Sequence, residues 1–311
     1  MNEKFDELTR SLARPVTRRT AIKRVGLSFA GMALARFGLN EAKAITNGQL
    51  DGDAHPNVAC FVWLQSLWPP VPAPVFGGSG ILIHPRVVLT AGHGTNLIQS
   101  AIAQGLMTLD DLLLSFASDA TDPATWRTIS AVVTHPDFDS KGPVVDGAGD
   151  IPLADVGVAI LTEPAIGLPL TPLPPLGFLD DLDATGPLRH GSDRADFTVV
   201  GYGTVLGDPV GQVPFPPDGL RRFAQSEFLN LHDRWLFLNQ NAVQGNGGGG
   251  TGDSGGPVFW VDPMTGTTTL VATTSRGDLR NRALGVAYRV DTLEAIGFLN
   301  DVIARVEAGD M

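Results

Sequence analysis

Cysteine is nearly absent from this sequence. Cys60 is the only one among 311 residues, so the chain forms no intramolecular disulfide. Charged residues make up only 18% of the chain, whereas glycine and proline number 37 and 23. This balance disfavours long exposed helices and favours turns and short strands. Cys60 lies in an apolar run at residues 58–63, where we expect a buried strand.

Basic residues are scarce beyond residue 44, where the chain has 13 Lys and Arg but 29 Asp and Glu. The resulting formal charge of −16 excludes the basic surface that nucleic-acid binding requires. We therefore expect no nucleic-acid partner. Beyond solubility, an acidic balance of this kind indicates little about function.

The first 44 residues differ from the rest because they carry nine Lys and Arg. Residues 17–23 (TRRTAIK) resemble a twin-arginine export motif, and Ala42-Lys43-Ala44 fits an A-x-A signal-peptidase site. The apolar stretch between them, at 25–35, is too short to span a bilayer. We predict that 1–44 is a signal peptide and that the mature protein is secreted or periplasmic, with no stable membrane association. The alternative is an ordinary amphipathic helix.

The remainder consists of short apolar runs rich in β-branched residues and bounded by Gly, Pro or Asp. Such runs are typical of strands, and their spacing favours barrels or a sandwich. Residues 163–175 contain five prolines, which neither a helix nor a central strand tolerates. We predict an all-β chain with one half at 45–162, a linker at 163–176 and a second half at 177–311.

One helix is predicted, at the C-terminus. Asp291 is a candidate N-cap, with Glu294 placed three residues later as in a capping box. An apolar stripe then follows at helical spacing. Its members are Leu293, Ile296, Leu299, Ile303 and Val306.

The strongest chemical motif is Gly-Asp-Ser-Gly-Gly-Pro at residues 252–257. It places the hydroxyl of Ser254 on a tight turn flanked by glycines, and the N–H groups of Gly252 and Ser254 can converge on an oxyanion. The motif also fits the G-x-S-x-G elbow of α/β-hydrolases. That fold needs a histidine after the serine, and none follows Ser254.

A serine nucleophile needs a base and an orienting acid. His93 follows an apolar strand-like run and is flanked by glycines, unlike the other histidines. Asp155 leads directly into an apolar strand, so we favour it over Asp150 and Asp146 in the glycine-rich loop before it. The segment at 92–95 is also similar to the subtilisin histidine segment, but no convincing Asp segment precedes His93.

These motifs resemble the trypsin/chymotrypsin family. Residues 77–80 (GGSG) and 90–93 (TAGH) are similar to its segments around the histidine, and 155–161 (DVGVAIL) to its D-I-A-L-L. Weaker likenesses at 135–138, 200–204, 275–277 and 285–286 follow in the family's order, so the resemblance covers most of 45–305. It implies two six-stranded antiparallel β-barrels with a catalytic triad of His93, Asp155 and Ser254 in the cleft between them.

The resemblance also implies a serine endopeptidase that acts on protein or peptide substrates, without cofactor or metal, and we expect a monomer. In the family, a new N-terminal ammonium pairs with the Asp before the nucleophile, which here implies Ile45 with Asp253. The specificity pocket would have Gly248 as its floor and Ser275, Gly277 and Gly285 as its walls. Without a carboxylate on that floor, we expect apolar specificity, although Asp278 lies close enough in sequence to alter it.

Three features depart from the family pattern. Gly92 and Gly94 flank His93 where many members have Ala and a disulfide Cys, and Arg276 replaces a Trp. The last change bears on the shape of the substrate cleft. Two other functions stay open at this point: a non-catalytic binding module on the same fold, and a secreted esterase that uses the same triad.

Overall fold

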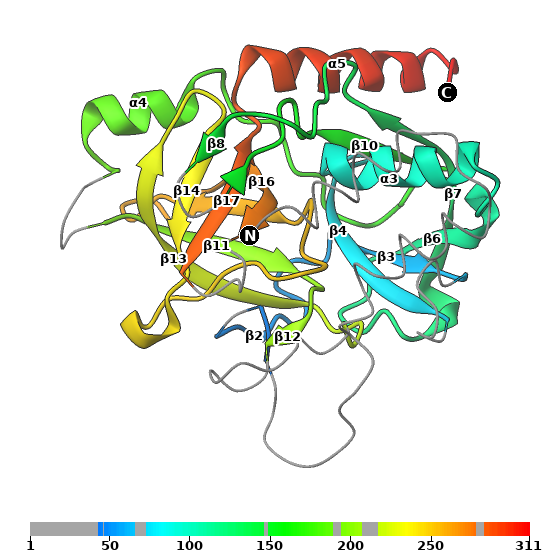
Figure 1. Ribbon diagram of the computed structural model, residues 1–311, viewed down its shortest axis with the longest axis horizontal. Coiled ribbons are helices and arrows are strands. Elements are labelled where there is room, and N and C mark those ends of the chain that lie inside the picture. The colour runs from blue at the N-terminus through cyan, green and yellow to red at the C-terminus, as the bar shows by residue number, and fades with distance from the viewer. Residues whose placement is uncertain are drawn as a thin grey trace.

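Two closed, six-stranded antiparallel β-barrels form the body of the protein (Figure 1). The computed structural model describes residues 43–45, 47–65, 73–145, 149–188, 194–206, 217–277 and 283–311. The predicted fold, a double barrel with a C-terminal helix, is confirmed. The twin-arginine motif and the apolar stretch at 25–35 lie outside the described residues.

The first barrel has the strand order β10-β5-β4-β3-β6-β7. Successive side chains of β3 alternate between two cores, as the pleat of a strand requires. Phe61 and Trp63 enter the barrel interior, whereas Val58 and Cys60 join a second cluster outside it. Burial on both faces explains why this strand is a continuous apolar run. The strands are β3 (Val58–Trp63), β4 (Val75–His84), β5 (Val87–Thr90), β6 (Leu112–Ser115), β7 (Trp126–Thr134) and β10 (Gly157–Leu161).

The second barrel has the order β11-β15-β16-β17-β14-β13, and pairing of β11 with β13 closes it. A seventh strand, β2 (Gln49–Leu50), pairs with β13 although it precedes the first barrel in sequence. The segment at Gln49–Leu50 therefore belongs to the sheet of the second barrel, although the strands of the first barrel follow it in sequence. The six barrel strands are β11 (Asp196–Gly201), β13 (Arg222–Leu231), β14 (Trp235–Asn239), β15 (Pro257–Val261), β16 (Thr268–Gly277) and β17 (Leu284–Arg289).

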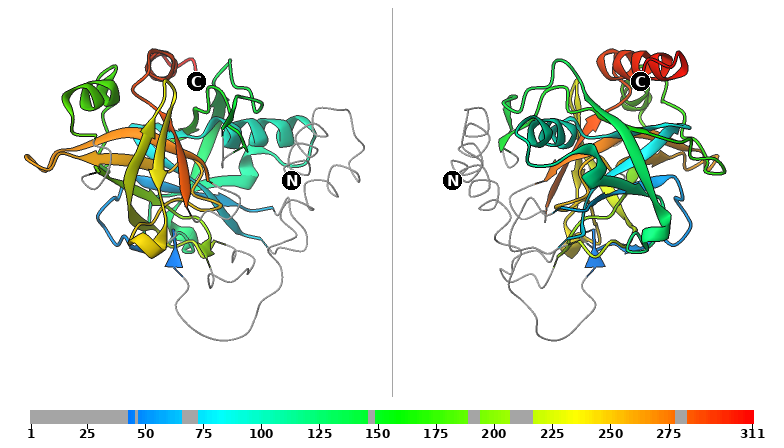
Figure 2. Two further views of the ribbon diagram at one scale, coloured as in Figure 1. Left: turned by 60° about the vertical axis from the view of Figure 1, so that its left-hand side comes forward. Right: turned by 90° about the vertical axis from the view of Figure 1, so that its right-hand side faces the viewer.

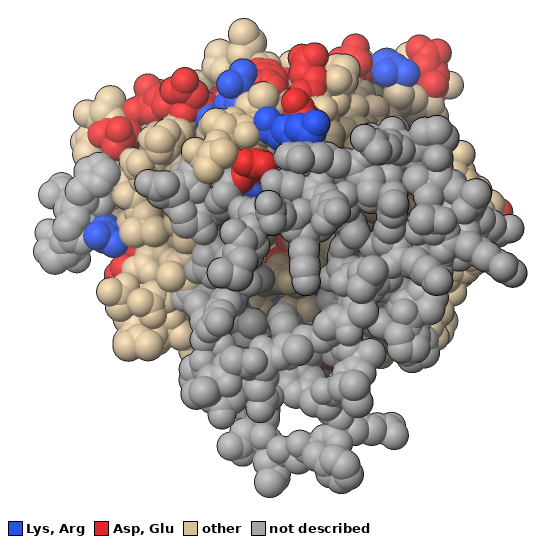
Figure 3. Space-filling model, viewed as in Figure 1, with Lys and Arg blue, Asp and Glu red and all other residues tan. Residues whose placement is uncertain are grey.

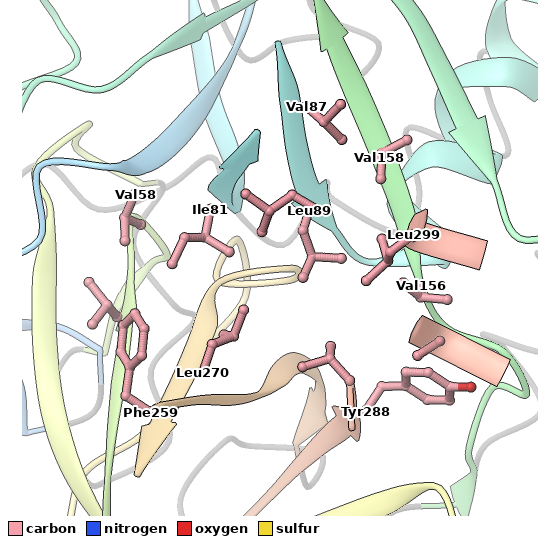
Figure 4. Packing of buried hydrophobic residues seen from close by; sticks show 14 of the residues in the cluster. Val58, Ile81, Val87, Leu89, Val156, Val158, Phe259, Leu270, Tyr288 and Leu299 are labelled. Carbon is pink, nitrogen blue, oxygen red and sulfur yellow. The ribbon is translucent and has the colours of Figure 1, made fainter. Parts of the chain in front are cut away.

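A shared hydrophobic cluster joins the two barrels and the C-terminal helix (Figure 4). Ile81 and Leu89 from the first barrel face Leu270 from the second, and all three are buried. Leu299 of the C-terminal helix belongs to the same cluster. Because each fully buried aliphatic side chain contributes about 1.5–3 kcal/mol, this cluster fixes the barrels against each other. A fixed contact is what a site assembled from both barrels needs.

Within the described ranges, three α-helices lie on the outside of the barrels (Figure 2). They are α3 (Gly92–Ala103), α4 (Phe178–Thr185) and α5 (Leu293–Glu307). Acidic side chains, with a few basic ones among them, lie along the edge that carries α4 and α5 (Figure 3). Only α5 was predicted from the sequence. In the described residues no helix is long and apolar enough to cross a bilayer.

The predicted start and buried face of α5 need correction. Thr292, not Asp291, is the N-cap and accepts the N–H of Ala295. Asp291 is buried, where it binds Arg289 and accepts the N–H of Leu179. Leu293 is 74% exposed, because the buried stripe is rotated round the helix from the predicted one. The stripe consists of Ala295, Leu299, Val302 and Val306.

Short elements complete the described chain. No helix or strand occurs between β10 and α4, where the proline-rich linker was predicted. Two small ribbons pair β1 (Lys43–Ala44) with β12 (Val205–Leu206), and β8 (Val144–Val145) with β9 (Gly149–Asp150). Three 3₁₀ turns cover Leu109–Asp111, Pro123–Thr125 and Ala242–Gln244.

Candidate active site

His93, in the first turn of α3, and Asp155, just before β10, form a hydrogen-bonded pair. Nδ1 of His93 lies 2.9 Å from Oδ2 and 3.1 Å from Oδ1 of Asp155. The backbone N–H of His93 donates to Oδ1 of the same carboxylate at 2.7 Å. Asp155 is fully buried, while the His93 side chain is 33% exposed. The acid is thus enclosed and the imidazole reaches solvent, as a base that must meet a substrate requires.

The electrostatics of the pair favour a charged imidazole. Burial of the His93 ring disfavours protonation, but the charge and hydrogen bond of Asp155 outweigh it and raise the pKa of His93. Arg276 contributes a charge that acts to lower that pKa. Burial likewise acts to raise the pKa of Asp155, but His93 and Ser275 hold it below its usual value. An ionised acid in this position can stabilise an imidazolium at His93.

Two glycines allow this pairing. A Cβ on Gly157 would lie 2.3 Å from Oγ1 of Thr95, and one on Gly92 would lie 2.9 Å from the backbone N of Val156. Without these side chains, the first turn of α3 packs directly on the segment that carries Asp155. That close approach brings the N–H of His93 to the carboxylate. Gly92, noted as a departure from the family pattern, therefore has a local packing reason.

The loop of Ser254 is held against the first barrel. The N–H of Ser79 donates to the carbonyl of Ser254 at 2.8 Å, and the N–H of Gly78 donates to that of Gly252 at 3.0 Å. A Cβ on Gly255 would lie 2.1 Å from Oγ1 of Thr90. Thr90 ends β5, directly before the segment that leads into α3 and His93. The loop that carries Ser254 thus packs against the end of β5, three residues before His93.

Positive φ angles shape this loop, with +96° at Gly252 and +82° at Gly255. The N–H groups of Asp253, Gly255 and Gly256 are bonded to backbone carbonyls. Those of Gly252 and Ser254 donate to no acceptor in the described part of the chain. The two predicted oxyanion donors are therefore the ones left free. In the same residues, no hydrogen bond joins the Ser254 hydroxyl to the His93 ring; such bonds often tighten only when substrate binds.

Asp253 is fully buried beneath the loop. Its carboxylate accepts the N–H groups of Gly203 and Gly250, each at 2.7 Å. Burial raises the pKa of Asp253 to about 7, although these N–H groups act to lower it. No ion pair to Asp253 occurs among the described residues. Ile45 is also fully buried, and its nitrogen belongs to the peptide bond with Ala44, so the predicted ammonium requires cleavage at that bond.

The structure gives a further role to one residue of the predicted specificity pocket. The hydroxyl of Ser275 donates to Oδ2 of Asp155. Ser275 lies on β16, the strand whose end at Gly277 pairs with Gly285 of β17. Its side chain therefore supports the acid. Sequence reasoning missed this role, because the likeness of 275–277 to the family segment carries no direction for the side chain.

A second residue near the pocket was not considered from the sequence. A Cβ on Gly248 would lie 2.4 Å from Oε1 of Gln240, and one on Gly285 would lie 3.1 Å from the same atom. The expected floor and wall therefore enclose the end of a buried glutamine. Nothing in the sequence next to Gln240 marks it, since its position depends on how β14 and β17 pair.

No three His, Cys, Asp or Glu side chains converge as a metal site in the described ranges. A scan of the sequence against protein-family models gives no match, and a search of curated proteins gives none either.

Proposed function

We propose that the protein is a serine endopeptidase of the trypsin/chymotrypsin kind, with His93, Asp155 and Ser254 as its catalytic triad. The observation that carries the proposal is the buried carboxylate of Asp155, which binds both the ring and the backbone N–H of His93. Docking of the Ser254 loop at the end of β5 supports it. A purely structural histidine does not need a glycine-flanked serine turn with free N–H groups beside it.

In the proposed reaction, Oγ of Ser254 attacks the carbonyl carbon of the peptide bond and Nε2 of His93 takes its proton. The N–H groups of Gly252 and Ser254 donate to the oxyanion, and one such donor is worth about 2.7–4 kcal/mol of transition-state stabilisation. His93 then protonates the leaving amine as the C–N bond breaks, which leaves an acyl ester on Ser254. Water, deprotonated by His93, hydrolyses the ester, and the proton returns to Ser254.

The bonds around Asp155 explain its part in this reaction. Its contact with Nδ1 keeps the ring in the tautomer whose Nε2 accepts a proton. Its contact with the backbone N–H of His93 and with the Ser275 hydroxyl fixes the carboxylate in place. Three donors on one buried acid also satisfy the charge that burial would otherwise penalise.

Activation by signal removal forms part of the proposal. Cleavage after Ala44 would give Ile45 a free ammonium, and the buried Asp253 forms no ion pair within the described residues. Asn47 already binds the carbonyls of Gly245 and Asn246, so the segment lies along the loop that leads to Ser254. N-terminal sequencing of the exported enzyme tests this, and an active form that begins at another residue would refute it.

Labelling with a fluorophosphonate probe tests the function itself. The mature protein should react, and Ser254→Ala and His93→Ala should not. Folded variants that do not label, alongside a wild type that does, assign the nucleophile and base. A folded wild type that does not label would favour a non-catalytic module. Comparison of matched amide and ester substrates then separates a peptidase from an esterase.

A further inference from the structure

Gln240 presents a buried acceptor that the described structure leaves without a partner. It directly follows β14 and is only 1% exposed. Its backbone N–H donates to the carbonyl of Ala283 at 3.1 Å, and its Nε2 donates to that of Leu284 at 3.2 Å. Oε1 has no hydrogen-bond partner among the described residues. Leaving a buried amide oxygen without a hydrogen bond costs free energy, so the residues around it indicate which kind of ligand group could donate to it.

The contacts of Nε2 fix which way the amide faces. If oxygen and nitrogen were exchanged, Oε1 would meet the carbonyl oxygen of Leu284, and two acceptors would repel. With the observed orientation, Oε1 lies 2.4 Å from where a Cβ of Gly248 would be and 3.1 Å from one on Gly285. These two glycines are the expected floor and wall of the specificity pocket. The acceptor therefore packs against the two glycines that are expected to form the floor and one wall of that pocket.

A second unpartnered group packs against Gly249, the residue that follows Gly248. Thr274 of β16 is 9% exposed, and its Oγ1 has no partner in the described residues. Its Cγ2 would lie 2.8 Å from a Cβ on Gly249, the residue after the expected floor. The hydroxyl of Ser226 is also near the floor, but it already donates to the carbonyl of Gly247. Two groups that pack against adjacent glycines, one amide oxygen and one hydroxyl, are thus without a hydrogen-bond partner in the described residues.

We propose, on the basis of the proposed peptidase function, that Gln240 determines primary specificity and that the pocket takes a carboxamide side chain, glutamine or asparagine. The substrate's amide N–H donates to Oε1 of Gln240, and its carbonyl accepts from the hydroxyl of Thr274. Apolar side chains leave both groups unpaired. Lysine and arginine bury a cation opposite a neutral amide. This replaces the apolar preference expected from a floor of glycine.

The test uses mature enzyme and matched peptide amides that differ only in the residue before the scissile bond: Gln, Asn, Met, Leu or Arg. Glutamine and methionine have similar length, so their ratio of kcat/KM isolates the polar contact. We expect glutamine to exceed methionine by about 10- to 100-fold, the range for a buried hydrogen bond and the cost of leaving its partner unpaired. Equal rates, or a preference for methionine or arginine, would overturn the proposal.

Two substitutions make the test specific to Gln240. Gln240→Leu keeps the size and removes the acceptor, so the preference for glutamine should fall to about unity. Gln240→Glu changes a single group and adds charge, so cleavage after arginine should rise relative to glutamine. Gln104→Leu is the matched control, because Gln104 is exposed at the far end of α3. It should retain the wild-type ratio.

Fluorophosphonate labelling separates the two proposals. Absence of labelling in folded wild-type enzyme means that the peptidase proposal itself fails. If wild type and variants all label but Gln240→Leu keeps the glutamine preference, only the role of Gln240 fails. Should Gln240→Leu not fold, the rise in cleavage after arginine in Gln240→Glu decides the matter, and no rise overturns the assignment.

Discussion

Replacement of Gly157 by alanine tests how α3 places His93. The new Cβ would lie 2.3 Å from Oγ1 and 2.8 Å from Cγ2 of Thr95, about 1 Å short of normal contact. Thr95 is fully buried, and its hydroxyl bonds the carbonyl of Gly92 at 3.0 Å and the hydroxyl of Thr134 at 2.8 Å. The threonine cannot rotate away without losing both bonds. The first turn of α3 must therefore move outward, and the N–H of His93 moves with it.

Overpacking of this kind costs about 1–3 kcal/mol in the free energy of unfolding. A displacement of about 1 Å at a catalytic group costs roughly 100-fold in rate. We expect Gly157→Ala to lose stability in urea unfolding and about 100-fold in kcat/KM on a peptide amide. Adding Thr95→Ala removes both close atoms, so the double variant should regain much of the lost activity despite losing two hydrogen bonds.

Gly94→Ala is the matched control in the same helix. Its Cβ would meet nothing within 4 Å, so activity should stay at the wild-type level. Alanine is also favoured over glycine in a helix by about 0.5–1 kcal/mol, so stability should not fall. Wild-type unfolding and wild-type kcat/KM in Gly157→Ala would refute the claim that close packing of α3 positions the base.

Three further predictions follow from charges around the site. Ser275→Ala removes a hydrogen-bond donor from Asp155, so the pKa of Asp155 should rise. We expect kcat/KM on the same peptide amide to fall about tenfold. An unchanged kcat/KM would contradict a role for Ser275 in supporting Asp155. Arg276→Ala removes a charge that lowers the pKa of His93, so the acid limb of the kcat/KM profile should move to higher pH, since His93 must be neutral to act as base. Uncleaved Ser254→Ala protein should lose stability as pH rises from 5 to 8, because folding raises the pKa of Asp253 from 3.8 to about 7 and so favours its protonated form. The slope of unfolding free energy against pH should shrink when Asp253→Asn is added, and a slope of opposite sign would contradict the assignment.

The all-β fold was predictable because strands that are buried on one or both faces appear as short apolar runs, whereas the choice of two six-stranded barrels over a sandwich came from the resemblance to the trypsin/chymotrypsin family. The pairing of His93 with Asp155 was predictable for a related reason: a carboxylate that leads into a buried strand needs a partner. In both cases the signal is local in sequence.

Features that depend on distant segments were missed. The helix α3 was not predicted because Gly92 and Gly94 lower helix propensity, whereas packing on the segment before β10 stabilises it. Gln240 gains its place only when β14 pairs with β17. The predicted N-cap of α5 was one residue too early, because Asp291 is buried and accepts a hydrogen bond from Arg289 instead of capping the helix. Each of these outcomes is decided by a tertiary contact.

The bonds from Gly78 and Ser79 to the loop of the second barrel carry a consequence for limited proteolysis. A cut at an exposed position of the proline-rich stretch at 163–176, such as Ile166, would sever the chain but none of these contacts, so the nicked protein should stay assembled and keep its reactivity. A fragment of the second barrel alone would retain its strands, yet it would lack the two peptide groups that hold the serine turn in shape. Neither half can therefore be expected to react by itself, and mixing the separated halves should restore reactivity only to the extent that they dock.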